Sequence, residues 1–151
     1  MNALIVYDSV YGNTEKIARA IAEAIAPSGE AKVLRAGEAN PSELASIDLL
    51  IVGSPTHAGR PTPAIQDLLN KVTQPSLKDI NVAAFDTRSQ AKLARIFGNA
   101  AGRIARYLTR KGGVLIASPE GFFVTGTKGP LKEGELERAA VWARGILESK
   151  K

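Results

Sequence analysis

The chain has 151 residues, of which 44% are hydrophobic and 23% charged, and it carries a net charge of +5 and no cysteine. This length and composition predict a single globular domain over residues 1–151. The lack of cysteine excludes disulfides, thiolate metal sites and thiol nucleophiles. Residues 1–6 lack the basic start and cleavage site of a signal peptide and are too few to span a membrane, so we expect a cytoplasmic protein.

The positive charge is concentrated in one part of the chain. Residues 88–120 carry seven basic side chains and one acidic one, whereas residues 1–87 carry seven basic and ten acidic ones. Such a concentration indicates a surface for an anionic partner. The same charge concentration also fits an arginine-rich helix face that is exposed to solvent and binds no partner.

Short apolar runs alternate with amphipathic stretches along the chain. Residues 4–7 are apolar at successive positions, which predicts a parallel strand buried on both faces. Ile17, Ile21 and Ile25 then recur every four residues, as on the buried stripe of a helix. Residues 31–34 predict a second strand.

The middle of the chain continues this alternation. Residues 40–43 indicate the start of a brief helix with Asn40 as its N-cap. Residues 49–52 predict a third buried strand. The helix that follows Thr62 has an apolar stripe at Ile65, Leu68, Leu69 and Val72.

The last part of the chain predicts two more strands, at residues 82–85 and 114–117. The helix between them has its apolar stripe at Ala101, Ile104, Ala105 and Leu108. The final helix is expected to bury Leu136, Ala139, Ala143 and Ile146. Residues 119–131 are rich in glycine and predict a folded-back loop whose Phe122 and Phe123 pack on the core, and Trp142 is expected to pack there too.

Five strands that alternate with helices predict an α/β fold with a parallel sheet. In such sheets ligands bind beyond the carboxyl ends of the strands, where the strand order reverses. The candidate site therefore lies in the segments that follow the first, third and fourth strands.

The first loop, residues 9–14, runs from the first strand directly into a helix. It contains the hydroxyls of Ser9 and Thr14, the amide of Asn13 and a flexible Gly12. Together with backbone N–H groups at a helix start, these donors form an anion site that suits a monophosphate. The loop lacks the GxGxxG and GxxxxGK[ST] patterns of dinucleotide and ATP sites. The same residues also fit a simple capped turn.

The second loop, residues 55–60, and the third segment, residues 86–88, follow the next two strands toward the candidate site. In the second loop the Ala58–Gly59 peptide is free to change conformation, and His57 is the only histidine of the chain. His57 is either a functional group at the crevice or an exposed side chain without a role. The third segment offers donors and an acceptor to the edge of a flat heterocycle, or else caps the chain that follows it.

Residues 7–18 read YDSVYGNTEKIA, which resembles the phosphate-binding signature of flavodoxins, S/T-x-T-G-x-T. They are more similar still to the flavodoxin domains of flavodiiron proteins. Residues 52–56 resemble the second flavin loop of the same group, and the similarity to this short-chain type runs along essentially the whole chain, including Phe97 and Gly98. The resemblance implies a flavodoxin-like three-layer fold, with a five-stranded parallel sheet in the order 2-1-3-4-5, and FMN as the cofactor.

The resemblance also implies a role for each segment. The first loop would hold the FMN phosphate through Ser9, Val10, Tyr11, Gly12, Asn13 and Thr14. The second loop would flank the isoalloxazine ring through Pro55, Thr56, His57, Ala58 and Gly59. Its Ala58–Gly59 peptide would flip to accept a hydrogen bond from N5–H of the flavin semiquinone. The third segment would cover the pyrimidine side of the ring through Asp86, Thr87 and Arg88.

Three features depart from the flavodoxin pattern. Tyr11 stands where flavodoxins usually have threonine, and the second loop and third segment lack the aromatic residues that usually sandwich the flavin. The chain is also basic, whereas flavodoxins are generally acidic. Arg60, Arg88 and a protonated His57 would favour the negatively charged reduced flavin by roughly 1 kcal/mol each if partly desolvated. We therefore expect a flavin that is less strongly reducing than in acidic flavodoxins.

These features predict an FMN-binding electron carrier with no catalytic residue and no metal. The alternative is an FMN-dependent NAD(P)H:quinone-type reductase that uses the flavin face left open by the missing aromatics. A phosphoreceiver of similar fold is set aside, because residues 53–55 and 118–119 do not match its acidic cluster and its lysine. The expected partners are redox proteins, acidic ones docking on the basic segment 88–111, with neither nucleic acid nor a membrane.

Overall fold

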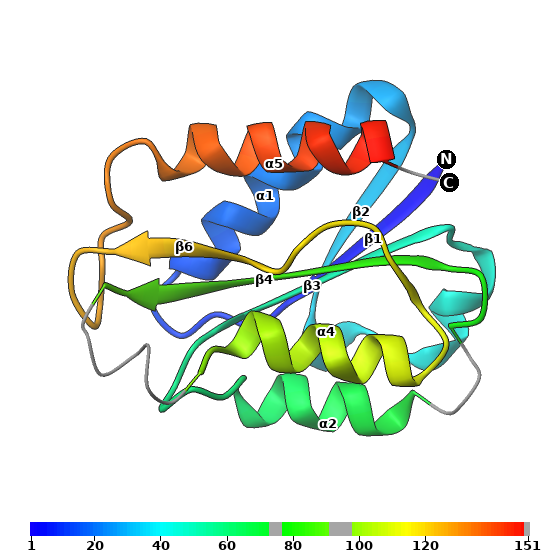
Figure 1. Cartoon of the computed structure of the whole chain (residues 1–151), viewed down its shortest axis with the longest axis horizontal. Coiled ribbons are helices and arrows are strands. Elements are labelled where there is room, and N and C mark those ends of the chain that lie inside the picture. Colours follow the sequence, from blue (N-terminus) through cyan, green and yellow to red (C-terminus); the bar gives the residue numbers. More distant parts are fainter. Residues whose placement is uncertain (73–76, 91–97, 150–151) are drawn as a thin grey trace.

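The computed structural model describes residues 1–72, 77–90 and 98–149, which form a twisted parallel sheet covered by helices (Figure 1). The strands lie in the order β2-β1-β3-β4-β5, and β6 also pairs with β4. Their bounds are β1 (Asn2–Tyr7), β2 (Glu30–Arg35), β3 (Leu49–Pro55), β4 (Asn81–Ser89), β5 (Val114–Leu115) and β6 (Glu120–Val124). The order 2-1-3-4-5 expected from the sequence is confirmed.

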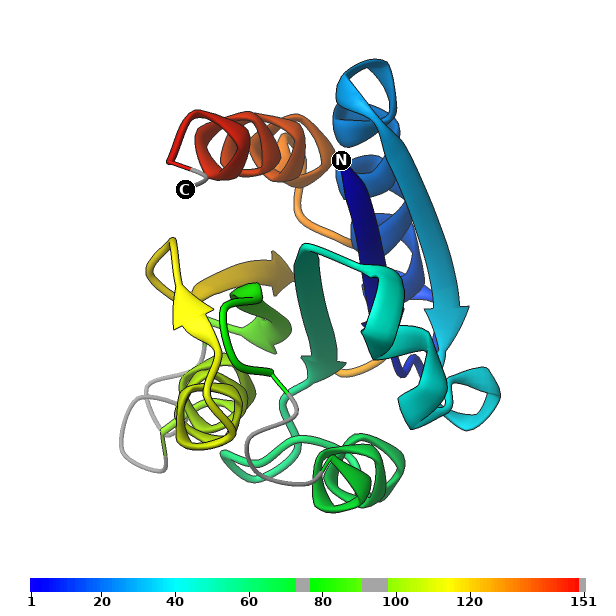
Figure 2. The same cartoon turned by 90° about the vertical axis from the view of Figure 1, so that its right-hand side faces the viewer.

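The helices form one layer on each face of the sheet (Figure 2). α1 and α5 cover one face, and α2 and α4 cover the other. The bounds are α1 (Asn13–Ile25), α2 (Pro63–Lys71), α4 (Ala100–Arg110) and α5 (Glu135–Ser149), with short 3-10 turns η1 (Ala26–Ser28), η2 (Ala36–Glu38) and η3 (Pro41–Ser46). The apolar stripes predicted for α1 and α4 are buried. Within the described residues, no helix is long and apolar enough to cross a membrane.

The fifth position of the sheet is shared by two short strands. β5 pairs with the beginning of β4, at Asn81 and Val82, and β6 pairs with the end of β4. The strand expected at residues 114–117 therefore ends two residues early, and β6 takes the place beside the rest of β4. The folded-back loop expected at residues 119–131 begins as a strand instead.

An aromatic cluster fills the core beneath α5. Phe85, Phe122 and Trp142 meet edge to face, with ring centroids 6.0 to 6.1 Å apart. Such pairs add roughly 0.5–1.5 kcal/mol each beyond the area they bury. The expected packing of Phe122 and Trp142 on the core is thus confirmed, whereas Phe123 is only partly buried.

One detail of the predicted helices was wrong, and another was confirmed. Leu136 is 43% exposed, because the buried stripe of α5 continues through Ala139 to Glu135 instead. The brief helix expected to start at residues 40–43 is confirmed as the 3-10 helix η3, with Asn40 as its N-cap; the side chain of Asn40 accepts a hydrogen bond from the N–H of Ser42 at 3.2 Å.

Candidate functional site

The first loop is a tight turn between β1 and α1. Gly12 has φ +91° and ψ −7°, a left-handed conformation that glycine adopts without strain. Ser9 Oγ accepts hydrogen bonds from the N–H of Gly12 at 3.0 Å and from the N–H of Glu15 at 3.4 Å. The N–H of Ser9 donates to Asp8 Oδ1 at 2.9 Å. These bonds close the turn at the start of the helix.

Four backbone N–H groups of this loop, on Val10, Tyr11, Asn13 and Thr14, have no acceptor among the described residues. Those of Asn13 and Thr14 begin α1, where a helix cannot satisfy its own donors. Val10 and Tyr11 are 53% and 49% exposed, so the turn opens to solvent. The positive end of the helix dipole adds to the four donors, and together they provide the chemistry of an anion site.

The start of α4 differs from the start of α1 because side chains satisfy its backbone donors. Three successive N–H groups donate to side-chain oxygens, Ala100 to Thr56, Ala101 to Asp86 and Gly102 to Asn99, at 3.0, 2.9 and 2.7 Å. These bonds fix α4 to the carboxyl ends of β3 and β4. The free donors therefore lie at the start of α1 and not at the start of α4.

Two side chains of the first loop are tied to distant segments. The hydroxyl of Thr14 lies 2.8 Å from the hydroxyl of Thr87, and both residues are buried. Asn13 Nδ2 donates to the carbonyl of Lys128 at 3.2 Å. Gly129, with φ +96°, lies so close that a Cβ there would fall 2.6 Å from the same amide nitrogen. The loop after β6 thus covers one side of the first loop. The phosphate-binding roles of Thr14 and Asn13 stay predictions.

The second loop contains a reciprocally hydrogen-bonded turn. The N–H of His57 donates to the carbonyl of Arg60 at 2.9 Å, and the N–H of Arg60 donates back at 3.0 Å. Ala58 and Gly59 both have positive φ, +51° and +79°, and for alanine this conformation costs about 1–2 kcal/mol. Arg103 Nε of α4 donates to the carbonyl of Gly59 at 2.8 Å and anchors the turn. His57 is exposed.

The third segment lies inside β4 and does not form a loop, which corrects the prediction. The reason is β6, which pairs with β4 from Phe85 to Ser89 and extends that strand. Asp86 is fully buried, and Arg88 binds it through Nε at 2.7 Å and Nη2 at 2.9 Å. Because Asp86 neutralises it, Arg88 does not supply the unpaired positive charge that the sequence led us to expect.

Two arginines that contact the loops were missed by the sequence reasoning. Arg35 ends β2, and its Nη1 donates to the carbonyl of Ser9 at 3.0 Å. The strand-end rule applied to the first, third and fourth strands would have found Arg35 if it had been applied to the second. Arg103 carried no such signal, because it lies on a helix face among other basic residues.

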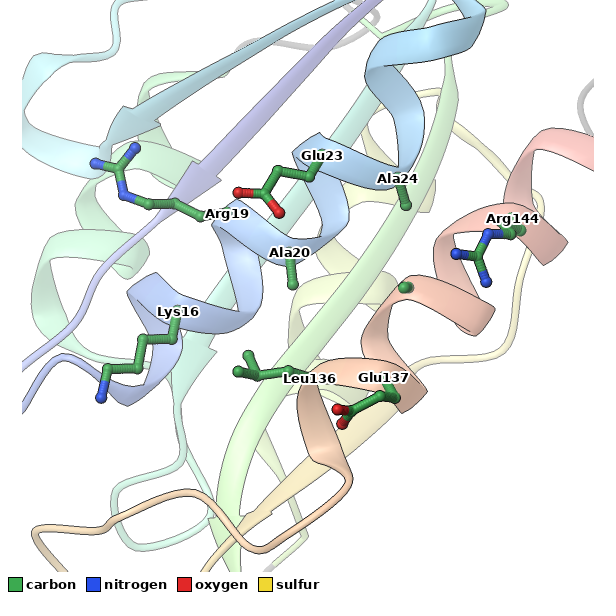
Figure 3. A pocket seen from close by; sticks show the side chains of 9 residues that line it. Lys16, Arg19, Ala20, Glu23, Ala24, Leu136, Glu137 and Arg144 are labelled. Carbon is green, nitrogen blue, oxygen red and sulfur yellow. The ribbon is translucent and has the colours of Figure 1, made fainter.

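A separate hollow of about 500 Å³ lies between α1 and α5 (Figure 3). It is lined by Lys16, Arg19, Ala20, Glu23, Ala24, Leu136, Glu137, Ala140 and Arg144. None of these residues belongs to the first loop, the second loop or the third segment. The hollow is therefore not part of the candidate site.

The fold and these loops define a class of protein, the doubly wound parallel α/β domains, here with a helix start that offers free N–H donors where the strand order reverses. The family model for the flavodoxin domain matches residues 4–105, which include the first and second loops. The chain belongs to the flavodoxin family, whose members are FMN-binding electron carriers.

Several solved structures share this fold. Oxidised flavodoxin 2 from Bacillus cereus has 24% identity and a TM-score of 0.84, covering 98% of this chain and 99% of that chain. Rubredoxin oxygen:oxidoreductase from Desulfovibrio gigas has 24% identity and a TM-score of 0.79 over 97% of this chain and 35% of that one. The Flv1 flavodiiron core from Synechocystis has 21% identity and a TM-score of 0.75 over 98% of this chain and 35% of that one. No curated protein matches the sequence. The resemblance to flavodoxins and to flavodiiron flavodoxin domains is confirmed.

The residues present fit FMN best at its phosphate end. There the first loop offers its four N–H donors, which are the groups that a phosphate monoester accepts. At the ring end, the strained turn of the second loop places His57 on the surface. Phe97, which formed part of the sequence resemblance, lies outside the described residues.

Proposed function

We propose that this chain carries electrons between redox proteins in the cytoplasm, with an FMN whose phosphate is bound by the first loop. The observation that carries the proposal is the set of four free N–H donors on Val10, Tyr11, Asn13 and Thr14. A phosphate monoester is largely a dianion at neutral pH, so it suits a helix start with several donors. FMN supplies the redox chemistry when bound, and the chain binds it and sets its electrostatic surroundings.

The second loop provides a peptide that can reorient. The hydrogen bonds of the turn occupy the backbone N–H and carbonyl of both His57 and Arg60, and Arg103 donates to the carbonyl of Gly59. The carbonyl of Ala58 and the N–H of Gly59 have no partner among the described residues. In our proposal this peptide is the part of the turn that hydrogen-bonds the flavin ring.

A basic face on α4 suits an acidic redox partner. The basic face consists of Arg103, Arg106, Tyr107 and Arg110, which surround a shallow hollow of about 320 Å³. Lys92 and Arg95, which belong to the basic segment 88–111, lie outside the described residues. Because Arg103 also anchors the turn of the second loop, a partner on the basic face would lie beside the proposed flavin site.

The visible spectrum tests the cofactor. Purified chain that is mixed with FMN and then desalted should keep a yellow chromophore in a near-equimolar amount, with its fluorescence changed from that of free FMN. A colourless protein that ignores added FMN would contradict the proposal.

Turnover distinguishes a carrier from the NAD(P)H:quinone-type reductase. A carrier should accept electrons from a separate reductase and deliver them to an acceptor protein, with little oxidation of NAD(P)H on its own. Steady oxidation of NAD(P)H by a quinone, with this chain as the sole protein, would favour the reductase.

The basic face is tested with a charge reversal. Arg106→Glu should slow electron delivery to an acidic acceptor roughly tenfold at low ionic strength. The difference should nearly vanish at about 1 M salt, where the Debye length is about 3 Å. Arg144→Glu on α5 makes the same charge change away from the basic face and should leave the rate unchanged. Equal effects of the two variants would rule out docking on the basic face.

A further inference from the structure

We propose that Arg35 is a positioning residue that sets the first loop in its phosphate-binding conformation. The proposal rests on the binding of FMN by that loop. Arg35 is the last residue of β2 and lies opposite Tyr7 of β1 in the parallel sheet, immediately before the first loop begins. Its guanidinium lies over the ring of Tyr7, 5.2 Å from the centroid, an arrangement that favours a cation over an aromatic face.

From this position the guanidinium of Arg35 contacts the first loop and both carboxylates beside it. Nη1 donates to the carbonyl of Ser9 at 3.0 Å and lies 3.6 Å from Asp8 Oδ1. Nη2 lies 3.5 Å from Glu15 Oε1 on the first turn of α1. One side chain thus joins the end of β1, the turn and the start of the helix.

The contact with Ser9 also determines the direction of a free donor. The carbonyl of Ser9 and the N–H of Val10 belong to one planar trans peptide, so they point in opposite directions. By holding that carbonyl, Arg35 turns the N–H of Val10 away from itself. This N–H is one of the four without an acceptor among the described residues. A cation on the carbonyl also polarises the peptide and makes its N–H a stronger donor.

The contacts with Asp8 and Glu15 reduce repulsion at the same place. Two carboxylates beside the first loop would repel a phosphate dianion. Arg35 pairs with both of them. Its side chain is 43% exposed, so screening by solvent and salt limits the size of this effect.

The test compares two ligands that differ only in the phosphate. FMN and riboflavin share the isoalloxazine ring, and the affinity of each is measured by fluorescence titration for the wild type, Arg35→Ala, Arg35→Lys and Arg19→Ala. Arg19 pairs with the same Glu15 at 3.0 Å but makes no contact with Ser9, so Arg19→Ala is the matched control. Thermal unfolding of each apoprotein shows whether the variants fold.

Arg35→Ala should bind FMN roughly tenfold more weakly and riboflavin within twofold of the wild type. Arg35→Lys should recover part of the FMN affinity because it restores the charge. Arg19→Ala removes only one of the two arginine partners of Glu15, so it should lose clearly less FMN affinity than Arg35→Ala. Unchanged FMN affinity in Arg35→Ala, or an equal loss for both ligands, would overturn the role of Arg35 while leaving the proposed function intact. A wild-type chain that binds neither ligand would overturn both.

Discussion

Gly12→Ala tests the first loop because nothing but backbone conformation changes. A Cβ on Gly12 would meet no atom within 4 Å, so no clash contributes. At φ +91° an alanine is disfavoured by about 1–2 kcal/mol. Alanine also lowers the conformational entropy of the unfolded chain, which offsets about 0.4–1 kcal/mol of this destabilisation. The apoprotein should therefore lose roughly 1 kcal/mol of unfolding free energy.

The same change should weaken FMN binding. If the loop relieves the strain by moving to negative φ, the peptides on both sides of Gly12 rotate, and the free N–H of Asn13 turns with them. A loss of about 1 kcal/mol corresponds to a roughly fivefold higher Kd.

Urea unfolding of the apoprotein and fluorescence titration with FMN measure the two effects. Gly145→Ala is the matched control. Its Cβ also meets nothing within 4 Å, but it lies inside α5, so alanine should stabilise the protein by about 0.5–1 kcal/mol. The unfolding free energy and the FMN affinity of Gly12→Asn should lie between those of Gly12→Ala and the wild type, since asparagine tolerates the left-handed region. If Gly12→Ala matches the wild type in both measurements, the assigned role of this turn is wrong.

Three further predictions follow from contacts elsewhere in the fold. The hydrogen bonds from Arg138 are the main cause of the lowered pKa of Glu135. The ionised Glu135 therefore stabilises the folded protein fully above the ordinary glutamate pKa of about 4.3, and this stabilisation is lost as the pH falls through the lowered pKa. Glu135→Gln should thus be less stable than the wild type by about 1–3 kcal/mol at pH 7, with a gap that narrows below about pH 4 in urea titrations; a gap that is constant with pH would contradict this. Arg103→Gln should lower the one-electron potential of the bound flavin by roughly 40 mV in a redox titration, and a potential that is unchanged or raised would count against a positive charge acting there. Gly53→Ala should destabilise the protein by about 1–3 kcal/mol in urea, because its Cβ would fall 2.0 Å from Phe85 Cζ; wild-type stability would show that the ring moves aside freely.

The first loop was accessible to sequence reasoning because its signal is local. An apolar run, a group of hydroxyl and amide residues with Gly12, and a helical repeat from Ile17 lie within a short stretch, and each has one simple structural meaning. The second loop was recognised in the same way from its place after the third strand. The positive φ of Ala58 was not, because alanine gives no sign of a left-handed conformation.

The third segment and the fifth strand were misjudged for one physical reason. Whether residues 86–88 form a loop depends on what pairs with them, and their partner is β6, more than thirty residues later in the chain. β6 reads EGFFV, whose two Phe residues and Val favour a strand, but nothing in these five residues shows that they pair with the end of β4. Pairing between distant segments has no local pattern that the sequence could display.

By itself, the sequence determined most of the strands and helices and the loop where we expect an anion to bind, because hydrophobic periodicity and the residues at a helix start act over a few positions. The tertiary structure alone decided what surrounds that turn. It brings Arg35 from the neighbouring strand onto the carbonyl of Ser9, and it buries Asp86 where Arg88 must neutralise it. These pairings depend on sheet register and helix docking, which bring together side chains that lie far apart in the sequence. The proposed anion site is therefore local in origin, whereas its electrostatic surroundings are set by the whole fold.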